Sequence, residues 1–86
     1  MPGYSKNDQK TLIAFGSVVR TKREALGMSQ EELAEEAHLH RTYMGGIEQG
    51  RRNLSLLNIL KVAKALGVEP GELFADMPKG GKKKST

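Results

Sequence analysis

The chain has 86 residues, which suits one small domain, and it contains no cysteine, so disulfides and thiolate metal sites are excluded. Lys and Arg number 14 against 10 Asp and Glu, but a basic balance alone is weak evidence for a nucleic-acid partner. No apolar run approaches the roughly 18 residues of a membrane span, and the N-terminus lacks the apolar stretch of a signal peptide. We therefore expect a small cytoplasmic domain.

The first predicted helix runs from Asp8 to Leu26, where apolar residues recur at the spacing of an amphipathic helix. Either Asn7 or Asp8 is suited to cap its N-terminus. Gly27 follows directly, at the position where a left-handed residue ends many helices.

A second, shorter helix is predicted to begin after Ser29. Ser29 and Glu32 have the spacing of a capping box, in which each side chain accepts a hydrogen bond from the backbone of the other. The apolar face of this helix consists of Leu33, Ala34 and Ala37. These mostly small side chains allow another helix to approach closely.

Two further helices are predicted near the C-terminus. Ser55 is suited to cap the first of them, and Gly67 to end it. Its predicted apolar face consists of Leu56, Ile59, Leu60, Val62 and Ala63. Pro70 favours the first turn of a short last helix. Strand patterns are essentially absent, so the predicted fold class is all-α, with about five short helices when one over residues 41–49, discussed below, is counted.

The sequence after Met77, PKGGKKKST, has no apolar residue and is typical of a disordered basic tail. The predicted organisation is an N-terminal extension over residues 1–7, a helical domain over 8–77 and the tail over 78–86. The tail is either a solvated end or a non-specific DNA arm. Among the last apolar residues, Leu73, Phe74 and Met77 either complete the core or form the seam of a dimer, and we favour a shared role.

The stretch HRTYMGGIEQGRRN, residues 40–53, carries adjacent glycines at Gly45 and Gly46. Adjacent glycines usually end a helix, since each costs roughly 1 kcal/mol relative to Ala inside one. A helix from Arg41 to Gln49 would nevertheless have one apolar face, made by Tyr43, Met44 and Ile47, with both glycines on the opposite, polar face. The glycines then serve either close packing against the preceding helix or close approach to another surface.

The residues around the glycines have the chemistry of a helix that reads DNA. A major groove is about 12 Å wide and admits one α-helix. Arg41 can donate two hydrogen bonds to guanine, and Thr42 offers a hydroxyl and a methyl group. The side chains that would then meet phosphates are Gln30, Arg51, Arg52 and Asn53.

The span from Arg23 to Leu73, over half the chain, resembles the lambda-repressor-like (XRE-type) helix-turn-helix family. MSQEELAEEA resembles the opening of the helix-turn-helix, IEQG the end of its recognition helix, and NLSLLNILKVAKALGV the helix that follows. Within the family, RTYMGGIEQGRRNLS is most similar to the controller proteins of restriction–modification systems. The resemblance implies five helices, with homodimers bound to a near-palindromic operator in double-stranded DNA.

The resemblance also implies roles for individual residues. Base contacts are expected from Arg41, Thr42 and Tyr43, with Gly45 and Gly46 allowing close approach. Phosphate contacts are expected from Ser29, Gln30, Gln49, Arg51 and Asn53, to which Arg52 is added because it directly follows the recognition helix. Arg23 is expected to form a structural ion pair with Glu48. No cofactor, metal or small-molecule effector is expected.

Three positions depart from the family pattern. The usual glycine of the turn is His38, which tolerates a left-handed backbone less well. The usual Ser or Asp cap of the recognition helix is His40, which puts that cap in question. Gly45, often serine in relatives, removes a possible hydroxyl contact.

Other classes of function fit less well. A P-loop would require GxxxxGK[ST] after a strand, and neither is present. The two histidines have no third metal ligand beside them, and the four glutamates between residues 31 and 36 are better explained as a solvated helix face than as an acid–base site. We therefore expect no enzyme. Two classes remain: an operator-specific regulator, and an antitoxin-type interaction protein whose DNA binding is autoregulatory.

Overall fold

The computed structural model describes residues 3–78, which form five helices. These are α1 (Lys6–Ala25), α2 (Gln30–Ala37), α3 (Arg41–Glu48), α4 (Leu56–Leu66) and α5 (Pro70–Ala75). No strand occurs among residues 3–78, which agrees with the predicted all-α fold. Within the same residues, no helix is long and apolar enough to cross a membrane. The predicted lysine tail lies outside the described residues, except for Pro78.

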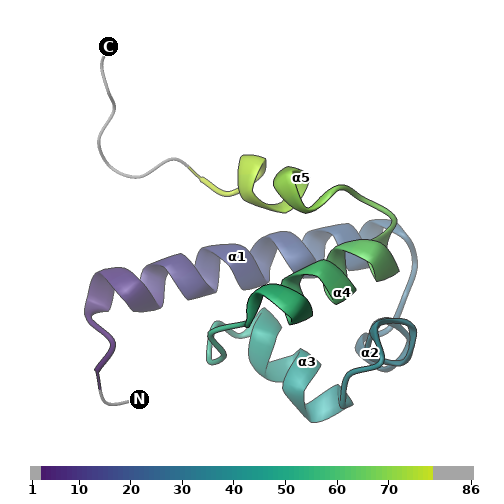
Figure 1. The fold of residues 1–86 in the computed structure, drawn as a ribbon, viewed down its shortest axis with the longest axis horizontal. Helices are drawn as coiled ribbons and strands as arrows, with labels where there is room; N and C mark the ends of the chain where they lie inside the picture. The colour runs from purple at the N-terminus through teal and green to yellow at the C-terminus, as the bar shows by residue number, and fades with distance from the viewer. Residues whose placement is uncertain (1–2, 79–86) are drawn as a thin grey trace.

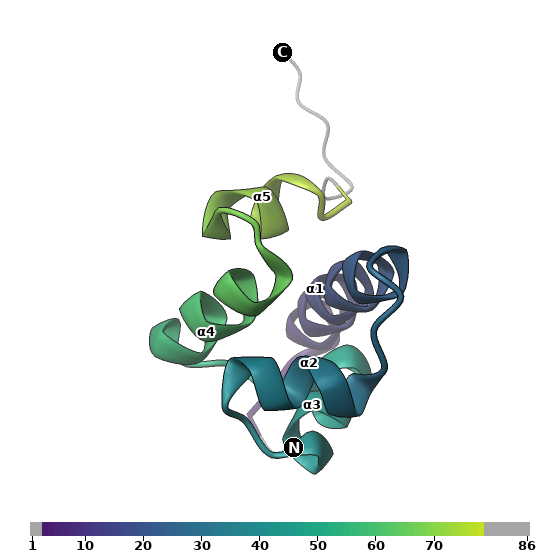
Figure 2. The same ribbon diagram turned by 90° about the vertical axis from the view of Figure 1, so that its right-hand side faces the viewer.

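The long helix α1 runs through the middle of the molecule, with α2 and α3 together on one side of it and α5 on the other (Figures 1 and 2). Helix α4 packs against α2, α1 and α5 and so connects the two sides. All five helices contribute buried apolar side chains to one core: Phe15, Val18, Val19, Leu33, Ala34, Ala37, Met44, Ile47, Val62, Ala63, Leu66 and Leu73. The arrangement leaves the outer face of α3 on the side opposite to α5.

The N-terminus of α1 is capped by Ser5, and the prediction of Asn7 or Asp8 as the N-cap is wrong. The Ser5 hydroxyl accepts from the Asp8 backbone N–H at 3.0 Å, and the Asp8 carboxylate accepts from the Ser5 backbone N–H at 3.2 Å. The two residues thus form a capping box that starts the helix at Lys6. Ser5, Asn7 and Asp8 are all residue types that cap helices. Ser5 and Asp8 are three positions apart, which is the spacing that lets each side chain accept from the backbone N–H of the other.

The start of the helix-turn-helix follows the predicted pattern. Gly27 adopts a left-handed φ of +71°, and Ser29 forms the predicted capping box with Glu32, with N···O distances of 3.0 and 2.8 Å. His38, at the position usually held by glycine, adopts φ 59° and ψ 42°. The turn therefore keeps its left-handed geometry, at the modest strain that this backbone imposes on a residue with a side chain.

The buried face of α4 agrees only in part with the predicted one. Val62 and Ala63 are buried as predicted, but Leu56 and Leu60 are 69% and 41% exposed, and Leu66, which was not predicted, is buried in their place. The helix sequence LLNILKVAKAL is apolar on more than one side, so periodicity does not decide which side packs inward. Because the face with Val62, Ala63 and Leu66 packs inward, Leu56, Leu57 and Leu60 are left exposed in the first half of α4.

Helix α5 is held on α1 by both apolar and charged contacts. The ring of Phe74 lies 6.0 Å from that of Phe15, measured between centroids. Lys22 pairs with Asp76 at 2.7 Å and with Glu72 at 3.5 Å, and the hydrogen bond to Asp76 is the main cause of a raised Lys22 pKa. Leu73 is fully buried in the chain's own core, so its side chain is not available to the predicted dimer seam.

Candidate nucleic-acid interface

The stretch around the adjacent glycines is helical, as its polar and apolar faces predicted. Helix α3 spans Arg41–Glu48 and ends before Gly50, which has a φ of +76°. Met44 and Ile47 are buried, whereas Arg41 and Thr42 are exposed. The first turn of α3 therefore presents its two polar side chains to solvent, at the edge of the molecule formed by α2 and α3 (Figure 1).

His40 caps α3 with its imidazole. The Thr42 backbone N–H donates to His40 Nδ1 at 3.0 Å, which satisfies one of the free amides at the start of the helix. The nitrogen that accepts is unprotonated, so the imidazole's other nitrogen carries the hydrogen in the neutral ring. The departure from the usual Ser or Asp therefore preserves the cap with a different acceptor.

The two adjacent glycines have different surroundings. A Cβ on Gly45 would meet only Gln30 Oε1, at an ordinary 3.6 Å, whereas a Cβ on Gly46 would meet Arg52 Cγ at 2.9 Å. Gly46 is buried beneath the Arg52 side chain. Gly46 is therefore packed within the chain, under Arg52 and not against the preceding helix that one of the two alternatives named. Gly45 is partly exposed and has no close neighbour that requires a glycine.

Tyr43 is held in place by two neighbours. Its hydroxyl accepts from Asn58 Nδ2 of α4 at 3.0 Å, and the guanidinium carbon of Arg52 lies 5.4 Å from its ring centroid, within the range of a cation–π contact. Arg52 thus packs over both Tyr43 and Gly46. Sequence reasoning missed Asn58, and its only signal was a polar residue within an otherwise apolar run.

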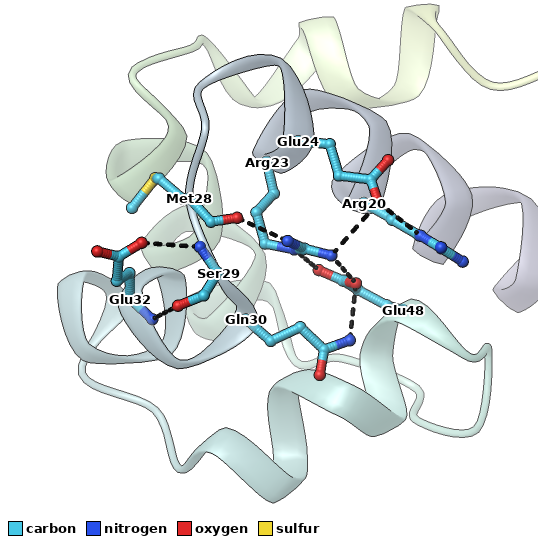
Figure 3. A network of polar contacts seen from close by, with 8 residues as sticks. All are labelled: Arg20, Arg23, Glu24, Met28, Ser29, Gln30, Glu32 and Glu48. Atoms are coloured by element: carbon cyan, nitrogen blue, oxygen red, sulfur yellow. Dashed lines mark hydrogen bonds and ion pairs between the residues drawn. The ribbon is translucent and has the colours of Figure 1, made fainter.

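A buried ion pair fixes the far end of α3 to α1 (Figure 3). Arg23 Nε donates to Glu48 Oε2 at 2.7 Å, and Arg23 Nη2 donates to Glu48 Oε1 at 3.1 Å. The hydrogen bond to Glu48 is the main cause of a raised Arg23 pKa. A third donor, Arg23 Nη1, reaches the Met28 carbonyl at 2.6 Å. The expected pairing of Arg23 with Glu48 is present.

Gln30 joins the same network, as Figure 3 shows. Its Nε2 donates to Glu48 Oε1 at 2.9 Å, so this amide ties the first residue of α2 to the end of α3. Ser29 beside it is engaged in the capping box with Glu32. Both predicted phosphate contacts therefore also have structural roles in the described chain.

Gly16 is a packing residue that sequence reasoning did not single out. A Cβ on Gly16 would lie 2.8 Å from the Glu48 carbonyl oxygen and closer still to that of Ile47. The missing side chain lets α1 cross the C-terminal end of α3 at backbone contact. A lone glycine within the apolar face of a long helix was the available signal.

Several of the predicted contact residues line hollows in three different places on the surface. One open hollow between α2 and α3 is lined in part by Ser29, Gln30, Arg41, Thr42 and Gly45. A second is lined by Gln49, Gly50 and Arg51 together with residues of α1 and the segment before it. Asn53 lies elsewhere, at an apolar hollow lined also by Phe74 and Met77. No group of three or more His, Cys, Asp or Glu within residues 3–78 is placed to hold a metal ion.

Comparison with known proteins gives consistent matches. Residues 19–73 match the family described as Helix-turn-helix. The chain is 55% identical over 63 residues to the control protein C.BamHI of Bacillus amyloliquefaciens, covering 72% of this chain and 78% of that protein. It is 42% identical over 74 residues to the control protein C.MunI of Mycoplasma sp, covering 85% of this chain and 97% of that protein.

Solved structures of similar sequence share the fold. The restriction–modification controller protein C.AhdI from Aeromonas hydrophila matches with a TM-score of 0.74 and 55% identity, over 74% of this chain and 97% of that one. The C.Esp1396I controller tetramer in complex with its natural 35-base-pair operator matches with a TM-score of 0.69 and 36% identity, over 74% and 84% of the two chains. This chain therefore belongs to the lambda-repressor-like (XRE-type) helix-turn-helix family and is a DNA-binding transcription regulator of the restriction–modification controller type.

Proposed function

We propose that the chain acts as a homodimer that binds a near-palindromic operator and controls restriction–modification genes, including its own. It would do so in the cytoplasm, on the bacterial or phage DNA that carries those genes. The observation that carries the proposal is the exposed first turn of α3, where Arg41 and Thr42 face solvent while the rest of the helix is fixed by buried contacts.

In this proposal α3 enters the major groove and its first turn reads the bases. Arg41 donates to guanine and Thr42 contacts a neighbouring base through its hydroxyl or methyl group. Gly45 lines the same hollow as Arg41 and Thr42. Because it has no side chain, it lets the backbone approach the base edges. Tyr43, restrained by Asn58 and Arg52, would lie beside the backbone or central base pairs. The contribution of Gly46 is indirect, through its packing with Arg52.

Phosphates on either side of the groove would be met by groups at the ends of the helices. The N-terminus of α2 offers backbone amides with the positive end of the helix dipole. The side chains proposed to contact phosphates are Ser29, Gln30, Gln49, Arg51, Arg52 and Asn53. Arg51 is exposed and has no ion pair with any described residue, so its charge is available for this role.

The dimer would form on the side of the molecule that carries α4 and α5. Phe74 is 50% exposed and Met77 is partly buried beside it. The leucines at the start of α4 add further exposed apolar area: Leu56, Leu57 and Leu60. An apolar surface of this kind on a small domain is typical of a protein–protein interface, and the related C.Esp1396I protein is a tetramer on its operator.

The same exposed leucines favour a second candidate, in which a different protein covers α4 and the chain acts as an antitoxin-type partner with autoregulatory DNA binding. The genes beside the coding sequence discriminate the two. A methyltransferase and an endonuclease support the controller function, and a toxin gene supports the alternative.

The experiment that tests the controller function uses the DNA upstream of the chain's own gene. We expect the purified protein to form a retarded complex that survives an excess of random-sequence competitor. Analytical ultracentrifugation should give two chains for each pair of operator half-sites. Deletion of the gene should also change transcription of the neighbouring restriction–modification genes. Complete loss of the complex to random competitor would contradict sequence-specific regulation.

A further inference from the structure

Glu31 and Arg41 form an ion pair between the two helices of the helix-turn-helix. Arg41 Nη1 donates to Glu31 Oε2 at 3.2 Å, from the first residue of α3 to the second residue of α2. The two side chains are 66% and 69% exposed. They line the same open hollow as Thr42 and Gly45, which is the surface proposed to face the bases.

Folding stability does not explain this pair. An ion pair between two exposed side chains contributes little, because water screens the attraction and both side chains lose freedom. A carboxylate on a surface that meets phosphates also opposes DNA binding in general. Glu31 therefore has a cost at this position unless it acts on the residue it contacts.

The geometry leaves the reading edge of Arg41 free. A guanidinium has five N–H donors, and a guanine takes two of them, from a pair of adjacent nitrogens. With Nη1 held by Glu31, Nη2 and Nε remain as such a pair. Both ends of the contact stand on fixed elements, since α2 is started by the Ser29 capping box and α3 by the His40 cap.

We propose that Glu31 is a positioning residue that holds the Arg41 guanidinium in the orientation needed to read a guanine. The inference rests on the proposed role of Arg41 in base recognition. An arginine with a long flexible side chain can otherwise turn to a phosphate, which attracts it whatever the sequence. By holding Nη1, Glu31 favours the base over the phosphate and so increases discrimination more than affinity.

Two other roles for Glu31 lead to different results. If Glu31 competes with DNA for Arg41, its removal tightens operator binding and does not reduce discrimination. If Glu31 only stabilises the first turn of α2 through the helix dipole, its removal lowers the folded fraction and weakens all duplexes in equal proportion. The ratio of affinities between matched and mismatched duplexes therefore separates positioning from both.

The test uses the duplex that the wild-type protein enriches from a randomised DNA library, and a variant duplex with the Arg41-dependent base pair changed. Wild type, Glu31→Gln, Arg41→Ala and the double variant are titrated with both. Glu36→Gln is the matched control, because Glu36 is exposed on the same helix and makes no hydrogen bond or ion pair with residues 3–78. Circular dichroism and urea unfolding check that each variant is folded.

We expect Glu31→Gln to reduce the base preference by about twofold to fivefold, the range of a solvent-exposed ion pair, and Glu36→Gln to leave it unchanged. In the Arg41→Ala background Glu31→Gln should have no further effect on the preference. In the free protein, the 1H–15N heteronuclear NOE of Arg41 Nε should fall in Glu31→Gln.

An unchanged or increased base preference in Glu31→Gln would overturn the inference while leaving the regulator function intact. The inference also fails if Arg41→Ala keeps the full preference, since Arg41 then reads nothing that Glu31 could improve. If the library yields no enriched sequence, the proposed function fails and this inference fails with it.

Discussion

Glu48, the last residue of α3, accepts two hydrogen bonds from Arg23 of α1, at 2.7 Å from Nε and 3.1 Å from Nη2. The Glu48 side chain is 2% exposed and that of Arg23 is 10% exposed. Because the third Arg23 donor holds the Met28 carbonyl, a single guanidinium connects α1, the loop before α2 and the end of α3. The orientation of α3 relative to α1 therefore depends on the buried Arg23–Glu48 pair, which lies on the inner side of α3.

Removing either partner of this pair should destabilise the fold strongly. Arg23→Ala leaves the Glu48 carboxylate buried without its charge partner, which typically costs about 3–5 kcal/mol in the free energy of unfolding. Urea unfolding monitored by circular dichroism measures it. Arg20→Ala is the control, since its pair with Glu24 is exposed on both sides and should contribute less than about 1 kcal/mol. Equal effects of the two substitutions would contradict a structural role for the buried pair.

Arg51→Ala should weaken binding to all DNA sequences by a similar factor. Arg51 is exposed in the loop after α3, and a lost phosphate contact lowers the slope of log K against log salt by about 1. Titrations at four or more salt concentrations, with operator and random duplexes, measure this slope. A slope equal to that of the wild type would exclude Arg51 as a phosphate contact.

The two glycines of α3 should respond differently to substitution. Gly45→Ala meets no close neighbour and should stabilise the helix by up to about 1 kcal/mol, while its methyl group lowers operator affinity if the backbone must lie close to the bases. Gly71→Ala in α5, where a Cβ also has free space, controls for the gain in helix stability. Stronger folding together with unchanged operator affinity would show that Gly45 is only tolerated.

Gly46→Leu should keep the far-UV helical signal and abolish operator binding. The new side chain would have to displace Arg52, whose Cγ lies 2.9 Å from the position of a Cβ, and so release its contact with Tyr43. Loss of binding in Gly46→Leu therefore reports on Arg52 as well as on the groove, and Arg52→Ala is the companion variant. Wild-type operator affinity in Gly46→Leu would contradict both explanations.

Phe74→Lys should yield folded monomers with weak operator affinity. The ring is 50% exposed, so a lysine there can reach water in the monomer, but it would place a charge in the proposed dimer seam. Sedimentation measures the oligomeric state. Leu26→Lys, at a residue 55% exposed outside α4 and α5, is the control. A variant that stays dimeric would place Phe74 outside the seam, and a variant that unfolds would show that the contact of Phe74 with the Phe15 ring is needed for folding.

Much of the fold could be predicted because local chemistry decided it. The Ser29 capping box, the left-handed Gly27 and the helix that begins at Arg41 depend on neighbours within a few positions, and each is present. The pairing of Arg23 with Glu48, by contrast, spans 25 residues. It was expected only from the family resemblance, since spacing alone does not bring these two residues together.

The predictions that failed concern choices between equivalent local options. Ser5 caps α1 in preference to its neighbours because Asp8 reciprocates. Which side of α4 is buried depends on how the helix packs against α1, α2 and α5. Its sequence also places leucines, among them Leu56 and Leu60, on a side that stays exposed. Gly46 was assigned to the polar face because a helical projection shows only the residues of the helix itself. The loop that follows α3 brings the Arg52 side chain over Gly46, and the projection does not include this loop.

The most direct test of sequence-specific recognition by α3 is selection of binding sites by the purified protein from a randomised duplex library, repeated with Arg41→Ala. The wild type should enrich two inverted half-sites, and Arg41→Ala should lose the preference at one base pair of each, at a cost of about 1–3 kcal/mol. Either no enriched sequence with the wild type or an identical enriched sequence with Arg41→Ala would contradict base reading by α3.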